Sequence, residues 1–231
     1  MKKLSLILLL FGFAVTMTAQ TTPKKDWAKY EKYAAANEVI LQAIAADPDA
    51  APKAVFMGNS ITELWFKHRP SFFEENDYAA RGISGQTTYQ MLARFQRDVV
   101  DLHPEAVVIL AGINDIAENS GPISIDNIVG NIKSMCDIAW ANGIQPILCS
   151  VLPCDYLSWR KDLTPAQDVV DLNTKILAMA QSEGIAYVDY YTALDNGQGG
   201  LGPEHSGDRC HPNEAGYQIM ETIIQSLLMS L

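Results

Sequence analysis

The 231-residue sequence has only four cysteines, Cys136, Cys149, Cys154 and Cys210, and no CxxC pair among them. The sequence therefore does not support a zinc ribbon or a thioredoxin-type redox motif. Four cysteines are also too few to define a disulfide scaffold in a chain of this length. If one bridge forms, we favour Cys154–Cys210, because both are expected on loops at the same edge of the fold. Buried free thiols fit the sequence equally well.

Basic residues are scarce, with 17 Lys and Arg against 27 Asp and Glu and a formal net charge of -10. An acidic surface repels phosphate backbones and anionic membranes, so nucleic acid is not an expected partner. This charge leaves a neutral small-molecule or glycan ligand possible. The 48% of hydrophobic and 19% of charged residues predict one globular domain with a substantial core.

Only the N-terminus carries a long apolar run, and no later segment is apolar enough to cross a membrane. Lys2 and Lys3 precede the run Leu4 to Val15, as in a secretory signal peptide. We predict cleavage after Ala19 and an exported protein, periplasmic or extracellular. An uncleaved anchor is the alternative, but the run is shorter than the roughly 20 residues that span a bilayer. The predicted parts are a signal peptide (1–19), an N-terminal segment with a helix (20–52) and the main domain (53–231).

Short apolar runs alternate with helical patterns along the main domain. The predicted strands are Ala54 to Gly58, Tyr78 to Ile83, Ala106 to Ala111, Ile144 to Leu152 and Ile185 to Asp189. The predicted helices are Trp27 to Ala46, Thr87 to Val100, Ile123 to Asn142, Thr164 to Ser182 and Asn213 to Leu231. This alternation predicts an α/β fold whose parallel sheet is covered on both faces. Ligands of such sheets bind beyond the carboxyl ends of the strands.

Three residues that follow predicted strands are candidates for a functional site. Ser60 lies at a strand-to-helix turn, as a nucleophile or simply as a helix N-cap. Gly85 lets the backbone approach an oxyanion, although an ordinary turn glycine explains it as well. The Asn114 amide can donate to an oxyanion, or it can cap a helix.

Asp208 and His211 lie three residues apart on a loop before the last predicted helix. This spacing allows the carboxylate to fix the tautomer and orientation of the imidazole. A salt-bridged surface histidine is the alternative. A metal site formed with Glu204 and His205 is also conceivable, but no HExxH or similar spacing supports it.

Ser60, Gly85, Asn114 and His211, in this order and each after the expected element, resemble the four blocks of the SGNH hydrolases, or GDSL esterases. The segments Gly58 to Trp65 and Ile83 to Thr88 look most like a bacterial subgroup related to platelet-activating-factor acetylhydrolase and carbohydrate acetylesterases. The resemblance implies a flavodoxin-like three-layer α/β/α sandwich with five parallel strands, and an acyl hydrolase without metal or cofactor.

The resemblance also implies the roles of the site residues. Ser60 is the expected nucleophile, His211 the base and Asp208 the orienting acid. The expected oxyanion hole consists of the N–H groups of Ser60 and Gly85 and the Asn114 amide. The family usually has aspartate before the serine, where this chain has Asn59, and threonine where it has Ile113. Neither change removes a group that transfers a proton, although Asn59 loses a charge at the turn.

No separate lid or long apolar insertion is visible in the sequence, which favours a small acyl group such as acetyl on a glycan. The alternatives are a lysophospholipase or thioesterase for longer acyl chains, and a catalytically silent glycan-binding module. Four aromatic residues are candidates for a sugar platform, or for core packing: Trp65, Trp159, Tyr190 and Tyr191. The loop from Asn196 to Gly207 holds five glycines and either borders the pocket or is a surface connection.

Overall fold

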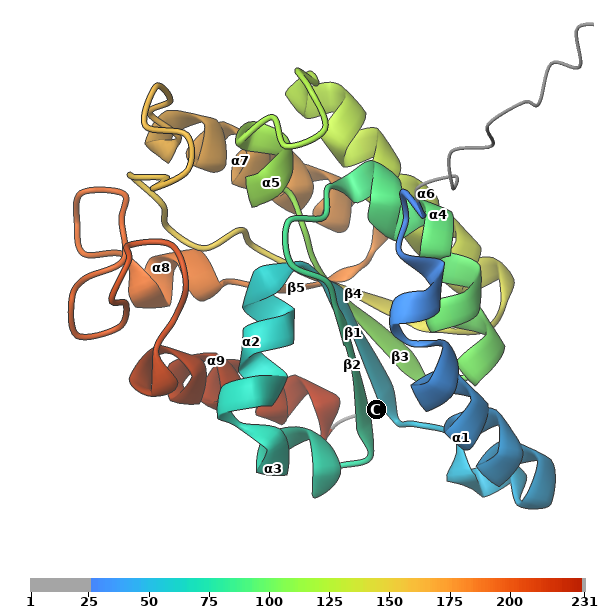
Figure 1. Ribbon diagram of the computed structural model, residues 1–231. Helices are drawn as coiled ribbons and strands as arrows, with labels where there is room; N and C mark the ends of the chain where they lie inside the picture. The colour runs from blue at the N-terminus through green and yellow to red at the C-terminus, as the bar shows by residue number, and fades with distance from the viewer. Residues whose placement is uncertain (1–25, 230–231) are drawn as a thin grey trace, which may run out of the picture.

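The computed structural model describes residues 26–229 and contains a five-stranded, all-parallel sheet (Figure 1). The strands are β1 (Ala54–Gly58), β2 (Tyr78–Gly82), β3 (Ala106–Leu110), β4 (Gln145–Cys149) and β5 (Ala186–Val188). Their order is β2-β1-β3-β4-β5, so the order reverses between β1 and β3. All residues of β1 and β3 are buried, as their uninterrupted apolar sequences predict.

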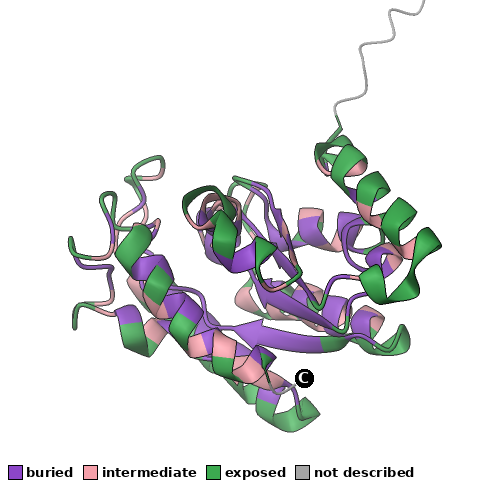
Figure 2. Ribbon diagram, turned by 90° about the horizontal axis from the view of Figure 1, so that it is seen from below, coloured by how far each residue is buried: buried purple, intermediate pink, exposed green. Residues whose placement is uncertain are grey.

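Helices cover both faces of the sheet and complete the predicted three-layer α/β/α sandwich (Figures 1 and 2). One face carries α2 (Ser60–His68), α3 (Pro70–Glu74), α8 (Tyr190–Leu194) and α9 (Glu214–Leu228). The other face carries α1 (Ala34–Ala46), α4 (Thr88–Asp98), α6 (Ile125–Ala141) and α7 (Ala166–Glu183). In Figure 2 the strands and the inner sides of the helices are buried, while the outer helix surfaces are exposed. The predicted fold class is confirmed.

The predicted helix from Trp27 to Ala46 is divided in the structure. Lys29 has a left-handed backbone with φ 53°, which prevents a continuous α-helix. A short 3₁₀ turn, η1 (Tyr30–Lys32), therefore precedes α1. The sequence indicated a helix after Ser60 but gave no bounds for α2, and it missed the short helices α3, α5 (Ile113–Ile116) and α8, because few turns give little periodicity to detect.

The core between the sheet and the helices α2 and α3 is rich in aromatic rings. Trp65 stacks on Phe72 and on Tyr217, with ring centres 5.3 and 5.6 Å apart, and meets Phe56 edge-on. Burial of such rings fixes α2 on the sheet, and with it the residues at the N-terminus of α2. Those residues include Ser60.

The predicted signal peptide (1–19) and residues 20–25 of the predicted N-terminal segment lie outside the described residues. Within residues 26–229, no helix is both long and apolar enough to cross a membrane. The division of the chain into parts at residues 19 and 52 stays a prediction.

Candidate active site

Ser60 begins α2 directly after β1, at the carboxyl edge of the sheet. The side chain of Asn59 accepts a 2.9 Å hydrogen bond from the Ile61 N–H and caps the helix. An amide oxygen is sufficient for this bond, so the usual aspartate is not needed to build the turn. Ser60 itself is half-buried, and its hydroxyl faces the site.

The structure brings Ser60, His211 and Asp208 together in one hydrogen-bonded row. Ser60 Oγ lies 2.8 Å from His211 Nε2, and His211 Nδ1 lies 2.7 Å from Asp208 Oδ2. The two ends of the main domain thus meet across 151 residues of sequence. The row has the geometry of a nucleophile, a base and an orienting carboxylate.

The loop before α9 holds Asp208 as a charged acceptor. Its Oδ1 accepts the N–H groups of Cys210 and His211 at 3.0 and 2.8 Å. Burial by itself raises the pKa of the Asp208 carboxyl, but the hydrogen bonds from His211 and Cys210 outweigh it and lower this pKa below its usual value. The carboxylate is therefore ionised around neutral pH, and its negative charge can stabilise a protonated His211.

The predicted oxyanion donors lie at the same edge, after β2 and β3. Gly85 has a positive φ of 80°, which a side chain at this turn would disfavour. Asn114 is buried, and its amide nitrogen donates to the Gln86 carbonyl at 3.0 Å. One of the two amide hydrogens is thus used, and the other is available for a ligand. Because Ser60 follows β1 and Asn114 follows β3, the site occupies the point where the strand order reverses.

Asn119 orients this asparagine and was not predicted from the sequence. Its amide nitrogen donates to Asn114 Oδ1 at 3.0 Å and to the Gly85 carbonyl at 3.3 Å. These bonds fix which side of the Asn114 amide carries the hydrogens. No sequence pattern marks Asn119, since it lies in a turn five residues after Asn114.

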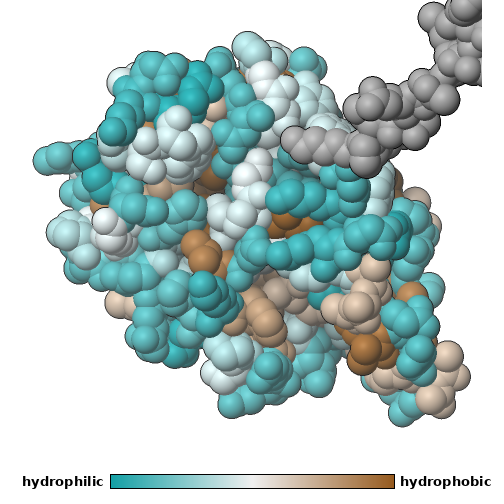
Figure 3. All heavy atoms as spheres, viewed as in Figure 1, coloured by the Kyte–Doolittle hydropathy of each residue, from teal (hydrophilic) through white to brown (hydrophobic). Residues whose placement is uncertain are grey.

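A pocket of about 370 Å³ opens onto the serine and lies at the lower end of the usual ligand-pocket range. Its lining comprises both predicted and unpredicted residues, namely Ser60, Leu64, Ser84, Gly85, Asn114, Asn119, Trp159 and His211. The face of the molecule seen in Figure 3 is largely hydrophilic, with hydrophobic residues in small patches near its centre and near α1.

Only one of the four proposed platform aromatics lines this pocket. Trp159 is 41% exposed, and its ring centre lies 6.4 Å from that of His211. Trp65 and Tyr190 are 1% and 0% exposed and belong to the core, so of the two predicted alternatives core packing is confirmed for both. Tyr191 is half-buried and packs against the core. The reason is position: Trp65 and the two tyrosines lie on helices packed against other helices, whereas Trp159 lies in a loop.

The glycine-rich loop from Asn196 to Gly207 lies beside the site loop but contributes no described residue to the pocket lining. Gly200 lies so close to Asp155 that a Cβ would meet its carboxylate at 2.5 Å. This part of the loop therefore packs on Asp155 and not in the pocket, which favours the surface-connection interpretation of the loop.

The metal alternative lacks a suitable set of donors. Within residues 26–229, no three His, Cys, Asp or Glu side chains are grouped as metal ligands would be. Both oxygens of Asp208 already face the imidazole or the backbone of its own loop. Glu204 and His205 are not joined to them.

All four cysteines are buried free thiols. Cys154 and Cys210 nevertheless lie close enough for each thiol to shift the pKa of the other, downward for Cys154 and upward for Cys210. The prediction that these two lie at the same edge of the sheet is confirmed, but they are not bridged here.

Residues 56–219 match the GDSL-like Lipase/Acylhydrolase family. A GDSL-like lipase from Bacteroides thetaiotaomicron is 43% identical, with a TM-score of 0.83 over 88% of this chain and 98% of its own. An acetylxylan esterase from Geobacillus stearothermophilus shares the fold at 19% identity and a TM-score of 0.62, covering 77% of this chain and 94% of that one.

Among curated proteins, an uncharacterised lipoprotein of Bacillus subtilis is 35% identical over 80 residues. The matched part spans 33% of this chain and 33% of that relative. The family match covers most of the described residues and includes all five strands except the first two residues of β1. The chain belongs to the GDSL-like lipase/acylhydrolase family and is a serine ester hydrolase.

Proposed function

We propose that this hydrolase is an exported esterase that removes small acyl groups, chiefly acetyl, from carbohydrate or other small esters. The observation that carries the chemistry is the row from Ser60 Oγ through His211 to Asp208, with distances of 2.8 and 2.7 Å. The row opens into a pocket that is also lined by the two other expected oxyanion donors, Gly85 and Asn114.

In the proposed reaction, Ser60 Oγ attacks the ester carbonyl carbon while His211 Nε2 takes the hydroxyl proton. Asp208 stabilises the imidazolium ion that forms. The N–H groups of Ser60 and Gly85 and the free Asn114 amide hydrogen receive the oxyanion. His211 then protonates the leaving alcohol, and a water activated by the same imidazole hydrolyses the acyl-enzyme.

The pocket supports a small acyl group. Its volume of about 370 Å³ must hold the ester and part of the leaving group as well. Trp159 offers an exposed aromatic face beside His211, which suits the apolar face of a sugar. The acetylxylan esterase with the same fold adds precedent for an acetylated glycan.

The proposed export rests on the N-terminal sequence and on the local similarity to a lipoprotein. The acidic mature chain agrees with a protein that does not adhere to anionic membranes. Cell fractionation, with N-terminal sequencing of the exported chain, tests both the compartment and the cleavage after Ala19.

A panel of acetylated polysaccharides, with acetate release measured for wild type and for Ser60→Ala, tests the activity. We expect release by the wild type and none above background for Ser60→Ala. Wild-type rates in Ser60→Ala would refute the assignment of the nucleophile.

A series of p-nitrophenyl esters of increasing chain length tests the acyl preference. A sharp preference for acetate supports the proposal, whereas a maximum at long chains indicates a lysophospholipase or thioesterase. Lack of labelling of Ser60 by a fluorophosphonate would favour the silent glycan-binding module. Activity that survives EDTA would exclude a metal requirement.

A further inference from the structure

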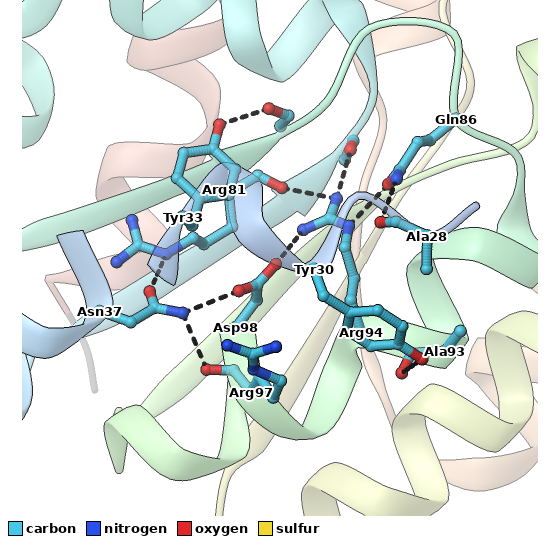
Figure 4. A network of polar contacts seen from close by, with 12 residues as sticks. Ala28, Tyr30, Tyr33, Asn37, Arg81, Gln86, Ala93, Arg94, Arg97 and Asp98 are labelled. Carbon is cyan, nitrogen blue, oxygen red and sulfur yellow. Dashed lines mark hydrogen bonds and ion pairs between the residues drawn. The ribbon is translucent and has the colours of Figure 1, made fainter. Parts of the chain in front are cut away.

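A segment outside the family match, residues 26–37, packs against the part of the chain that carries Gly85 (Figure 4). We call this segment the N-terminal brace. It comprises the turn before η1, η1 itself and the start of α1. Its polar contacts with residues 82–98 are made by both main-chain and side-chain groups.

Two glutamines outside the brace donate hydrogen bonds to main-chain oxygens of the brace. Gln86 Nε2 donates to the Ala28 carbonyl, and Gln90 Nε2 donates to the Trp27 carbonyl, both at 2.8 Å. Gln86 follows Gly85 directly and is 1% exposed, so its bond to Ala28 is shielded from water.

Two tyrosines of the brace donate hydrogen bonds in the opposite direction, to main-chain oxygens outside the brace. The Tyr33 hydroxyl donates to the Gly82 carbonyl at the end of β2, and the Tyr30 hydroxyl donates to the Ala93 carbonyl in α4 at 3.1 Å. Burial raises the pKa of Tyr33 to about 12, so this phenol keeps its proton and remains a donor at any physiological pH.

A buried arginine extends the connection to the serine turn (Figure 4). Arg94 is 0% exposed, and its Nε donates to Gln86 Oε1 at 2.6 Å. Its Nη2 donates to the carbonyls of Gly58 and Arg81 at 3.1 and 2.8 Å. Gly58 ends β1, two residues before Ser60. One guanidinium therefore holds the ends of two strands and the side chain that contacts the brace.

The counter-ion of Arg94 is in turn held by the brace. Arg94 Nη1 forms a 2.8 Å ion pair with Asp98 Oδ2, and Asn37 Nδ2 donates to Asp98 Oδ1 at 2.8 Å. Asn37 Oδ1 accepts from Arg81 Nε at 2.8 Å. Buried polar groups of this kind are costly unless every partner is present, so the network requires Asn37.

A second connection runs over the surface through Glu63. Lys32 Nζ pairs with Glu63 Oε1 at 2.8 Å, and Glu63 Oε2 accepts both the N–H and the hydroxyl of Ser84 at 2.6 Å. Ser84 precedes Gly85. Its position, and therefore the start of the Gly85 peptide, is set by a carboxylate that the brace contacts.

We propose that the N-terminal brace positions the oxyanion hole of this enzyme. Gln86 connects the brace to Asn114, because the Gln86 carbonyl accepts a hydrogen bond from the Asn114 amide. Ser84, which Glu63 holds, connects the brace to Gly85. The inference rests on the proposed roles of Gly85 and Asn114. An oxyanion hole must hold its donors within a fraction of an ångström, so a small displacement lowers transition-state stabilisation more than substrate binding.

The double variant Lys32→Met, Tyr33→Phe tests this proposal, because both changes keep the size and packing of the side chains. We expect kcat to fall about tenfold while KM changes less than twofold. The inhibition constant of a boronic acid, which forms a tetrahedral adduct on a serine oxygen, is expected to rise by the same factor as kcat falls.

The matched control is Lys133→Met on α6, which removes exposed ion pairs with Asp137 and Glu183, neither of which contacts the brace. It should leave kcat, KM and the inhibition constant unchanged. Hydrogen exchange of the intact enzyme adds a second measurement: the amides of residues 82–86 should exchange faster in the double variant than in the control. If the double variant does not fold, each single variant is measured in the same way.

A folded double variant with wild-type kcat and inhibition constant would overturn the proposal. Parallel assay of Ser60→Ala separates this result from failure of the proposed function. An inactive Ser60→Ala beside an unaffected double variant refutes only the brace, whereas an active Ser60→Ala refutes the serine mechanism itself.

Discussion

The indole N–H of Trp159 donates a 3.0 Å hydrogen bond to Asn119 Oδ1. The amide nitrogen of the same asparagine donates to Asn114 Oδ1. An exposed ring at the mouth of the pocket is therefore connected, through one side chain, to a proposed oxyanion donor. The relation joins the side chain proposed to contact the leaving group to the side chain proposed to stabilise the oxyanion.

Replacing Trp159 separates these two roles. In Trp159→Ala we expect KM for an acetylated xylo-oligosaccharide to rise about tenfold, because the variant loses apolar contact with the sugar face, and a loss of about 1.4 kcal/mol corresponds to a factor of ten. Hydrolysis of ethyl acetate, whose leaving group is too small to stack, should change less than threefold. Trp159→Phe keeps a ring but loses the bond to Asn119, so an equal loss in both variants would contradict the stacking role.

Removing the amide of Asn114 tests the oxyanion hole. Asn114→Ala is expected to lower kcat by about 10²–10³, or roughly 2.7–4 kcal/mol, since one donor to the oxyanion is lost. Ser60→Ala should lose far more activity. Steady-state kinetics measure the effect, and circular dichroism checks that the variant is folded. An exposed asparagine on α6, Asn127, provides the control as Asn127→Ala.

The buried carboxyl of Asp115 predicts a pH dependence of stability. Burial raises the pKa of Asp115 to about 6, against the hydrogen bonds that Thr88 donates. Because the folded state favours the protonated acid, this group stabilises the protein progressively as pH falls from about 7 to about 4. The opposite sign holds for Asp208, whose pKa is lowered and whose contribution is lost in acid.

Urea denaturation of wild type and Asp115→Asn at pH 7.5 and pH 4.5 measures the effect. The free energy of unfolding of the wild type, relative to the variant, should increase by about 1–3 kcal/mol at the lower pH. A difference that is the same at both pH values would show that Asp115 has no raised pKa.

The contact between the Cys154 and Cys210 thiols predicts that an oxidant will join them. Cys210 precedes His211, and the neighbouring Arg209 pairs with Asp155, so the two loops are already held together. With oxidised glutathione as the disulfide oxidant, we expect the loss of two thiols without a bound glutathione. The melting temperature should rise by about 5–10 °C, as for a bridge of typical strength in a domain of this size.

Thiol titration of the denatured protein, intact mass and thermal denaturation measure this change. Cys154→Ser should retain its remaining thiols and show no rise in melting temperature, whereas Cys136→Ser should behave as the wild type. Four thiols in wild-type protein after prolonged oxidation would contradict the prediction.

The amino-acid sequence by itself determined the sheet and the order of the site. Val107 to Leu110 is an uninterrupted apolar run, and such a run between helical patterns indicates a strand buried on both faces. In a parallel sheet the residues that follow the strands share one edge, so Ser60, Gly85 and Asn114 were expected to lie together. Asp208 and His211 are only three residues apart, so their contact could also be predicted from the sequence.

Only the tertiary structure decided which of several side chains of the same type line the site and which belong to the core. Trp65 and Trp159 are the same residue type, yet one is in the core and the other lines the pocket, because burial depends on what packs opposite. Asn119 and Asn37 act through partners that no local pattern identifies, and Asn37 meets Asp98 across 61 residues of sequence. Such contacts depend on how helices and loops pack in three dimensions, and periodicity carries no information about that packing.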